Sequence, residues 1–144
     1  MVTKNVRLAT VYDAEELSRL NHEFNGGDRV DSKNIQESIK NNTEIIAVAT
    51  VDERLVGFAC AQVLHSFCYS NAHGEITEMY VEESARRKGF ASLMIALLEE
   101  NLAERGVTSI KILTGKGNEA AIRTYLRSGY VVEDDIVLDK KVSC

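Results

Sequence analysis

The hydrophobic positions along the chain recur with two different periods. Residues 44–51 and 55–67 are β-branched, apolar runs joined by the polar residues 52–54, which predicts an antiparallel hairpin. Between residues 90 and 105 the apolar side chains recur at helical spacing, and Gly106 then predicts the end of an amphipathic helix. The chain therefore carries both strand and helix patterns.

Polar and glycine residues divide the rest of the chain into further elements. Asp13, with Glu16 three residues later, has the form of a capping box and predicts a helix that runs to about Phe24. Residues 75–81 form an apolar strand pattern before the amphipathic helix, and residues 70–74 a loop ahead of it. The remaining expected elements are strands over residues 6–8, 109–114 and 130–140, the last in one or two pieces, and helices over residues 32–39 and 118–127. In chain order, these elements predict a mixed α/β domain.

The composition predicts one globular domain over residues 1–144, because 44% of the residues are hydrophobic and 27% are charged. A net charge of -5 argues against nucleic acid as a partner, since phosphate-backbone binding needs a basic face. No run approaches the ~18 apolar residues that span a bilayer, and the first residues do not form a secretory signal. We therefore expect no membrane partner and a cytoplasmic location, which the three cysteines also fit.

One loop concentrates positive charge and small residues in this acidic chain. After the strand predicted over residues 75–81, three adjacent cations at residues 86–88 are followed by Gly89 and, one residue further on, Ala91. The first backbone N–H groups of a helix lack internal partners and attract anions, and small residues let an anion approach them. The loop could therefore cradle a pyrophosphate. A solvated turn before a helix explains the spacing about equally well.

This loop and a second segment together resemble a known family. Arg86-x-x-Gly89-x-Ala91, after the strand that ends at Val81, is similar to the acetyl coenzyme A signature [R/Q]-x-x-G-x-[G/A] of the GNAT superfamily of N-acetyltransferases. Downstream, residues 118–130 resemble the family's N-x-x-A-x-x-x-Y-x-x-x-G-[F/Y] segment. With the element order, the resemblance covers nearly the whole chain, although many relatives carry a longer final hairpin.

The resemblance implies the GNAT fold, an α/β fold with a central, twisted, mostly antiparallel sheet whose fourth and fifth strands splay apart, flanked by about four helices. It implies that acetyl coenzyme A is the co-substrate, with its pantetheine arm between the splayed strands and its pyrophosphate on the loop. The residues that it assigns to coenzyme binding are Met79, Tyr80, Val81, Arg86, Arg87, Lys88, Gly89, Phe90, Ala91, Ser92, Asn118 and Tyr125.

Acetyl transfer to an amine needs a group that takes a proton from the amine and a group that protonates the leaving thiolate. By the resemblance, Tyr125 is the candidate acid, and a core tyrosine is the alternative. The resemblance also makes Glu78, eight residues before Arg86, the candidate base, and Glu75 is less favoured. Solvated carboxylates at the end of the strand are the alternative, since many members of the family use a chain of waters without a dedicated base. Because their spacing is odd, the two carboxylates should point to opposite faces of a regular strand. Direct attack by the amine is expected, since neither motif contains a cysteine.

No bound metal is expected. Cys60, His65, Cys68 and His73 superficially offer ligands, but none of the zinc spacings is present. Cys60 and His65 are also an odd number of residues apart on one predicted strand, so they should face opposite ways. Cys60 and Cys68 are interpreted as packing residues.

Only the charge of one region and the family resemblance indicate which amine is the acceptor. Residues 13–31, which line the acceptor site in the family, hold six acidic residues against two basic ones, a net charge of -4. A small cationic amine, such as a polyamine or an aminoglycoside, is therefore the hypothesis, with Glu23 and Asp28 as candidate contacts. A solvated acidic face and a protein or peptide amine are the alternatives. The family habit of dimerising makes a homodimer the expected assembly.

Two other functions remain open. Gly115-x-Gly117-x-x-Ala120, between a strand and a helix, matches a dinucleotide-binding turn. Only 24 residues follow Ala120, too few for the further strand–helix units that such a fold needs. The second alternative is a non-catalytic domain that binds acyl coenzyme A as a sensor or as a subunit, against which Tyr125 and Glu78 weigh mildly.

Overall fold

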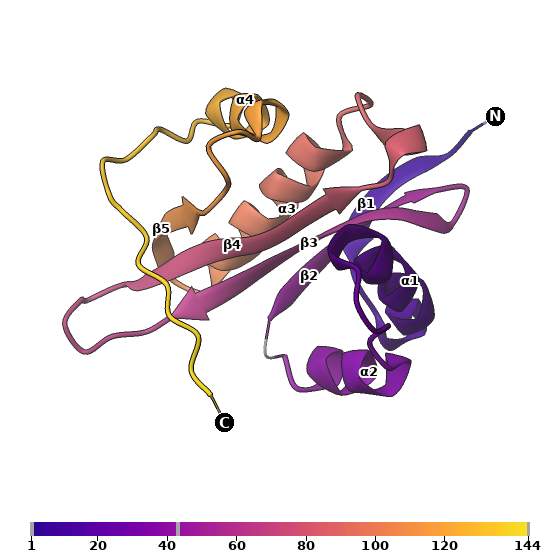
Figure 1. The fold of residues 1–144 in the computed structure, drawn as a ribbon, viewed down its shortest axis with the longest axis horizontal. Coiled ribbons are helices and arrows are strands. Elements are labelled where there is room, and N and C mark those ends of the chain that lie inside the picture. The colour runs from indigo at the N-terminus through magenta and orange to yellow at the C-terminus, as the bar shows by residue number, and fades with distance from the viewer. Residues whose placement is uncertain (1, 43, 144) are drawn as a thin grey trace.

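The computed structural model describes residues 2–42 and 44–143, which form one five-stranded sheet with helices on both faces (Figure 1). The strands, in their spatial order, are β1 (Lys4–Leu8), β2 (Ile45–Val51), β3 (Arg54–Leu64), β4 (Ala72–Val81) and β5 (Val107–Ile112). The helices are α1 (Ala14–Asn25), α2 (Ser32–Lys40), α3 (Phe90–Glu104) and α4 (Glu119–Arg127). The predicted mixed α/β architecture is confirmed.

The sheet is antiparallel from β1 to β4 and becomes parallel between β4 and β5. A parallel pair needs a long crossover connection, and α3 provides it. The pairing of β4 with β5 ends where Ile76 lies opposite Ile112, although β4 continues to Val81. The two strands therefore splay apart beyond Ile76, as the family resemblance implies.

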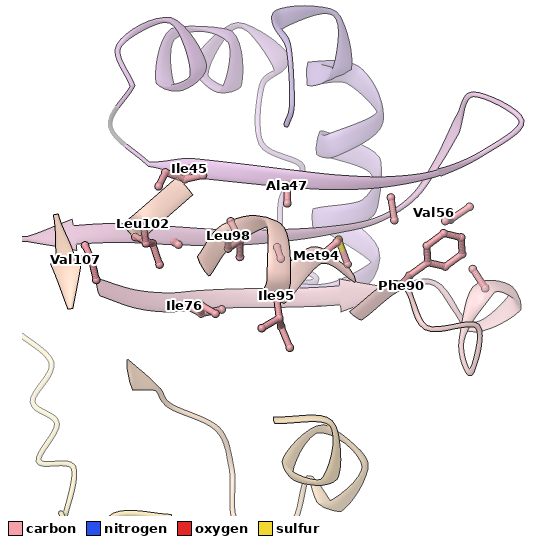
Figure 2. Packing of buried hydrophobic residues seen from close by; sticks show 14 residues of the cluster. Ile45, Ala47, Val56, Ile76, Phe90, Met94, Ile95, Leu98, Leu102 and Val107 are labelled. Atoms are coloured by element: carbon pink, nitrogen blue, oxygen red, sulfur yellow. The ribbon is translucent and has the colours of Figure 1, made fainter. Parts of the chain in front are cut away.

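Two apolar layers pack the helices against the sheet, one between the sheet and α3 and the other between the sheet and α1 and α2. On β2, Val48 points toward α1, whereas Ala47 and Ala49 point toward α3. This alternation is what a strand buried on both faces requires. Figure 2 shows the side chains of α3 directed at the strands. The α3 residues in this layer are Phe90, Met94, Ile95, Leu98 and Leu102.

Two β-bulges interrupt the strand pairing. The first adds Val56 to β3. The second adds Thr77 to β4, opposite the step from Cys60 to Ala61. An extra residue moves the alternation of side chains by one position. The residues of β4 beyond Thr77 therefore point to the faces opposite to those expected for a regular strand.

Three local predictions are wrong. Residues 130–140 form no strand in the described part of the chain, and residues 131–143 are all exposed, because an apolar pattern makes a strand only beside a partner strand. β4 begins at Ala72 rather than residue 75, because Ala72 pairs with β5, and His73 and Gly74 pair with both β3 and β5. Asp13 is in a capping box, but as the partner of Thr10 and not of Glu16. The Glu16 carboxylate instead accepts a hydrogen bond from the Leu55 N–H.

Asp13 anchors the start of α1 to β1. It accepts two hydrogen bonds from the Arg7 guanidinium, at 2.8 and 2.9 Å, and one from the Thr10 N–H at 2.7 Å. Burial alone would raise the pKa of Asp13, but the bonds from Arg7 and Thr10 outweigh burial and lower it. Ionised Asp13 therefore stabilises the fold above the unfolded-state pKa of ~3.9, and this stabilisation is lost as the pH falls through the lower folded-state value.

Asp13→Asn should lower the free energy of unfolding at pH 7 by about 1–2 kcal/mol, measured by urea unfolding. The loss stays below that of a fully buried pair because the Arg7 side chain is 38% exposed. The matched control, Asp139→Asn, breaks the exposed Lys141–Asp139 pair and should cost less than about 0.5 kcal/mol. The difference between wild type and Asp13→Asn should shrink below about pH 4, and a difference that grows there would contradict the assignment.

Candidate functional site

The cationic loop is fixed at both ends and exposed in the middle. After β4, residues 83–85 form a short 3₁₀ turn, and Ala85 is buried in the layer beneath α3. At the other end, Phe90 is buried in the same layer. Residues 86–89 between them are exposed. The side chains of Ala85 and Phe90 thus hold the loop on the core while its cations face solvent.

The N-terminus of α3 lies open beside this loop. Gly89 begins the helix with a φ of 83°, no side chain caps it, and no described atom lies within 4 Å of where a Cβ would stand. The first bond back along the helix is from the Leu93 N–H to the Gly89 carbonyl, at 3.1 Å. The N–H groups of Phe90, Ala91 and Ser92 precede it and lie at the positive end of the helix dipole. Together with the loop cations, they could hold a phosphate group.

Arg86 folds back onto the end of β4. Its Nε donates to the Val81 carbonyl at 2.8 Å, and its guanidinium carbon lies 5.9 Å from the centre of the Tyr80 ring. The Tyr80 ring stacks on Phe24 at 5.1 Å, and its hydroxyl donates to Glu23 at 3.2 Å. The Tyr80 side chain therefore lies on the α1 face of β4. The carbonyl of Val81, a residue assigned to coenzyme binding by the resemblance, thus already accepts a hydrogen bond from Arg86.

The edge of β4 beyond Ile76 has no neighbouring strand on the β5 side in the described part of the chain. Residues 77–81 pair with β3 on the other side. Backbone N–H and C=O groups on such an edge need other hydrogen-bond partners. An extended ligand that lies along β4 could supply them.

α4 brings the second predicted segment to the α3 face of the sheet. Tyr125 packs partly buried against this layer, with its ring 6.4 Å from that of Tyr130. The Tyr130 hydroxyl donates to Glu99 of α3 at 2.8 Å, which holds this pair against the helix. Burial raises the pKa of Tyr125, so its phenol stays protonated in the neutral range and can donate a hydrogen bond. Asn118 caps α4 by accepting from the Ala121 N–H at 3.4 Å.

The bulge in β4 decides which carboxylates share a face. The residues of β4 that point toward the α3 layer are Gly74, Ile76, Met79 and Val81. Glu75 and Glu78 therefore both point to the opposite face, the one covered by α1 and α2. The expectation that they lie on opposite faces is wrong, because Thr77 is an extra residue between them.

Glu44 lies in the same neighbourhood and was not identified from the sequence. Its carboxylate hydrogen-bonds with Cys60 and Ser38, and Cys60 lies directly opposite Glu78 across β3 and β4. Burial raises the pKa of Glu44, and the charge of Glu78 adds to that shift. Burial likewise raises the pKa of the Cys60 thiol well above its usual value, so this thiol stays neutral. Glu44 belongs to no motif, and the one signal for it was a charge at the start of an apolar strand.

Most acidic side chains of residues 13–31 are engaged in the structure. Of the two candidate substrate contacts, Asp28 lies exposed between α1 and α2. Glu23 accepts from Tyr80 and from Arg19. The other engaged carboxylates are those of Asp13 with Arg7, Glu15 with Arg29, Glu16 with the Leu55 N–H, and Asp31 with the Lys33 N–H. Most of the negative charge of residues 13–31 is therefore used within the protein, and this charge is weak support for a cationic acceptor.

Three further predictions concern metal, membrane and dinucleotide binding. Within residues 2–42 and 44–143, no group of three or more His, Cys, Asp or Glu side chains could hold a metal ion. None of the described helices is long and apolar enough to cross a membrane. The turn at residues 115–117 joins β5 to α4, and no further strand or helix follows α4 as far as residue 143. A dinucleotide-binding fold is therefore not built around that turn.

A sheet that opens next to the exposed start of a crossover helix is an architecture suited to acyl transfer from a coenzyme A thioester, since it offers both an extended edge and a phosphate site. The chain belongs to the acetyltransferase (GNAT) family, whose model matches residues 11–130, and it is an N-acetyltransferase that depends on acetyl coenzyme A. This membership confirms the resemblance noted in the sequence and sets the dinucleotide-binding interpretation aside.

Individual relatives agree with this assignment. A curated acetyltransferase of Yersinia pestis is 28% identical over 108 residues, which are 75% of this chain and 72% of the relative. The fold is shared with AAC(6')-Iy, solved with the bisubstrate analogue CoA-S-monomethyl-acetylneamine, at a TM-score of 0.86 and 18% identity over 98% of this chain and 99% of that one. It is also shared with the ribosomal-protein-alanine N-acetyltransferase of Brucella melitensis biovar Abortus, at a TM-score of 0.81 and 20% identity over 98% of this chain and 100% of that one.

Gly89→Ala should lower the free energy of unfolding by about 1–2 kcal/mol, because an L residue is strained in a left-handed conformation even where space is open. Acetyl coenzyme A, titrated by calorimetry, should bind about tenfold more weakly because the first turn of α3 relaxes. The matched control is Gly115→Ala, which is equally open but has no positive φ and should change both quantities little. Equal effects of the two substitutions would rule out the left-handed conformation as the cause.

Proposed function

We propose that this acetyltransferase acetylates the primary amine of a small cationic acceptor by direct attack on acetyl coenzyme A. The observation that carries the proposal is that Glu75 and Glu78 share the α1 and α2 face of β4, where this strand leaves β5, with Glu44 beside Glu78. Neighbouring carboxylates create a negative potential that attracts an ammonium group. The acceptor would then approach from this face, with Asp28 and Glu23 near its outer end.

The donor half of the proposal follows the open edge and the exposed helix start. The pantetheine arm would lie along residues 79–81, and the N–H groups of residues 87–92 would hold the pyrophosphate, with Arg86 nearby. Asn118 and Tyr125 would flank the thioester from α4. The fold neighbour AAC(6')-Iy, solved with the bisubstrate analogue CoA-S-monomethyl-acetylneamine, supports a coenzyme A site in this fold.

The reaction needs three proton transfers: two away from the amine nitrogen and one to the leaving thiolate. Glu78 would take a proton from the bound ammonium, directly or through water, since a protonated amine has no lone pair. The amine nitrogen then attacks the thioester carbonyl and the C–N bond forms. The nitrogen loses its second proton to solvent, and the tetrahedral intermediate collapses as the C–S bond breaks. Tyr125 would donate its proton to the departing thiolate. Burial raises the pKa of Tyr125, so the phenol carries its proton when the thiolate departs.

Tyr125→Phe should lower kcat by about a hundredfold, in the range found for general acids, and should leave the KM for acetyl coenzyme A within about twofold. Release of coenzyme A thiol measures both values. Tyr12→Phe is the matched control, because Tyr12 is 93% exposed and its hydroxyl should not matter. In wild type, the part of kcat that depends on Tyr125 should persist beyond the usual tyrosine pKa of ~10, because burial raises the pKa of this phenol. An unchanged kcat in Tyr125→Phe would show that water protonates the thiolate.

The acceptor proposal predicts that diamines, polyamines and aminoglycosides are better substrates than a monoamine of equal length. Glu78→Gln should lower kcat/KM for the amine by about a hundredfold at pH 7, and this deficit should shrink as rising pH deprotonates the free amine. Glu104→Gln, at the exposed far end of α3, is the control. A preference for peptides with a free N-terminus would instead favour a protein acceptor, which is what the name of the Brucella ribosomal-protein-alanine N-acetyltransferase indicates for that neighbour. Tight coenzyme binding without turnover on any amine would favour a sensor.

A further inference from the structure

Glu82 is a buried carboxylate at the junction of β4 and the cationic loop, and its side chain is only 10% exposed. Its backbone N–H donates to the Val56 carbonyl at 2.8 Å, and its own carbonyl accepts from the Ala85 N–H at 2.9 Å. The main chain therefore fixes Glu82 as the first residue of the loop that leads to the start of α3.

The Glu82 side chain joins the loop to two other elements. Arg54, the first residue of β3, donates to both carboxylate oxygens, at 2.6 and 3.2 Å. Arg19 of α1 donates at 3.5 Å, and the Ser84 hydroxyl within the loop donates at 3.2 Å. Burial alone would raise the pKa of Glu82, but the bonds and charge of Arg54 outweigh burial and lower it, so the carboxylate stays ionised.

Ala85 and Phe90 hold the loop on the core, but its side toward the β2–β3 hairpin is open. A hollow separates it from the β2–β3 hairpin, and polar side chains line much of that hollow. These side chains are Asp52, Arg54, Glu82, Ser84 and Lys88. Charge-assisted hydrogen bonds across a polar hollow hold their partners more firmly than neutral ones would. The bonds of Glu82 are thus the main link between the loop and the hairpin.

We propose that Glu82 is a positioning residue for acetyl coenzyme A. It does not touch the coenzyme but holds the backbone of residues 86–92 where their N–H groups converge on the pyrophosphate, by tying the loop to Arg54 and Arg19. This inference rests on the proposed donor site. The first step of the inference, that Glu82 orders the loop, does not depend on a bound ligand.

The sign of the binding change separates positioning from a simple charge effect. Glu82 is negative and lies near a site for an anion, so neutralising it would strengthen coenzyme binding if charge alone mattered. If Glu82 positions the loop, neutralising it weakens binding because the N–H groups lose their alignment. The two roles therefore predict opposite shifts in Kd.

Glu82→Gln should raise the Kd for acetyl coenzyme A about tenfold by calorimetry, with kcat at saturating coenzyme within about twofold of wild type. Arg54→Gln should give a similar rise, and the double variant should add little, because both break one link. Glu82→Asp keeps the charge on a shorter side chain and should fall between Glu82→Gln and wild type. The matched control is Asp13→Asn, another buried carboxylate paired with an arginine, which should leave Kd unchanged.

Hydrogen exchange of the coenzyme-free protein tests separately whether Glu82 orders the loop. Amides of residues 86–92 should exchange faster in Glu82→Gln than in wild type and should be unaffected in Asp13→Asn. An unchanged or lower Kd in Glu82→Gln, or unchanged exchange in these amides, would overturn the proposal. If wild type fails to bind acetyl coenzyme A, the donor site is wrong, whereas the exchange data still decide whether Glu82 orders the loop.

Discussion

The parting of β4 from β5 after Ile76 determines where everything else in the site lies. Because the two strands are parallel, the chain must leave the carboxyl end of β4 and return through α3. The helix therefore begins at the same end of the sheet at which the strands separate. An open strand edge and the positive end of a helix dipole are brought together by this connection alone. The cationic loop completes the site because it is the short link between them.

The two faces of the sheet are built for different tasks. The face under α3 is a continuous apolar layer, which gives the start of that helix a rigid base. The face under α1 and α2 also has an apolar centre, but three carboxylates lie toward one end of β4 and the Phe24–Tyr80 stack toward the other. A donor held at the α3 side and an acceptor held at the α1 and α2 side would meet at the gap between β4 and β5.

Some charged residues of this acidic chain attach its elements to one another. Asp13 and Arg7 join the start of α1 to β1, and the Arg54–Glu82–Arg19 group joins the same helix to β3 and to the loop. These links are partly buried, so removing one partner leaves the other poorly compensated. The loop cations and the β4 carboxylates take no part in these links; they are opposite in sign and would suit different ligands.

The sequence by itself determined the element order, the cationic loop and its strand–helix setting, because these depend on local periodicity and on short motifs within one segment. It also predicted a final strand that does not form, since residues 130–140 have the composition of a strand but no partner strand to pair with. Only the tertiary structure decided that Glu75 and Glu78 share a face, because a bulge is set by pairing with β3. It also brought Glu44 beside Glu78 and Glu82 beside Arg54, since contacts between residues far apart in the chain leave no periodic trace in its sequence.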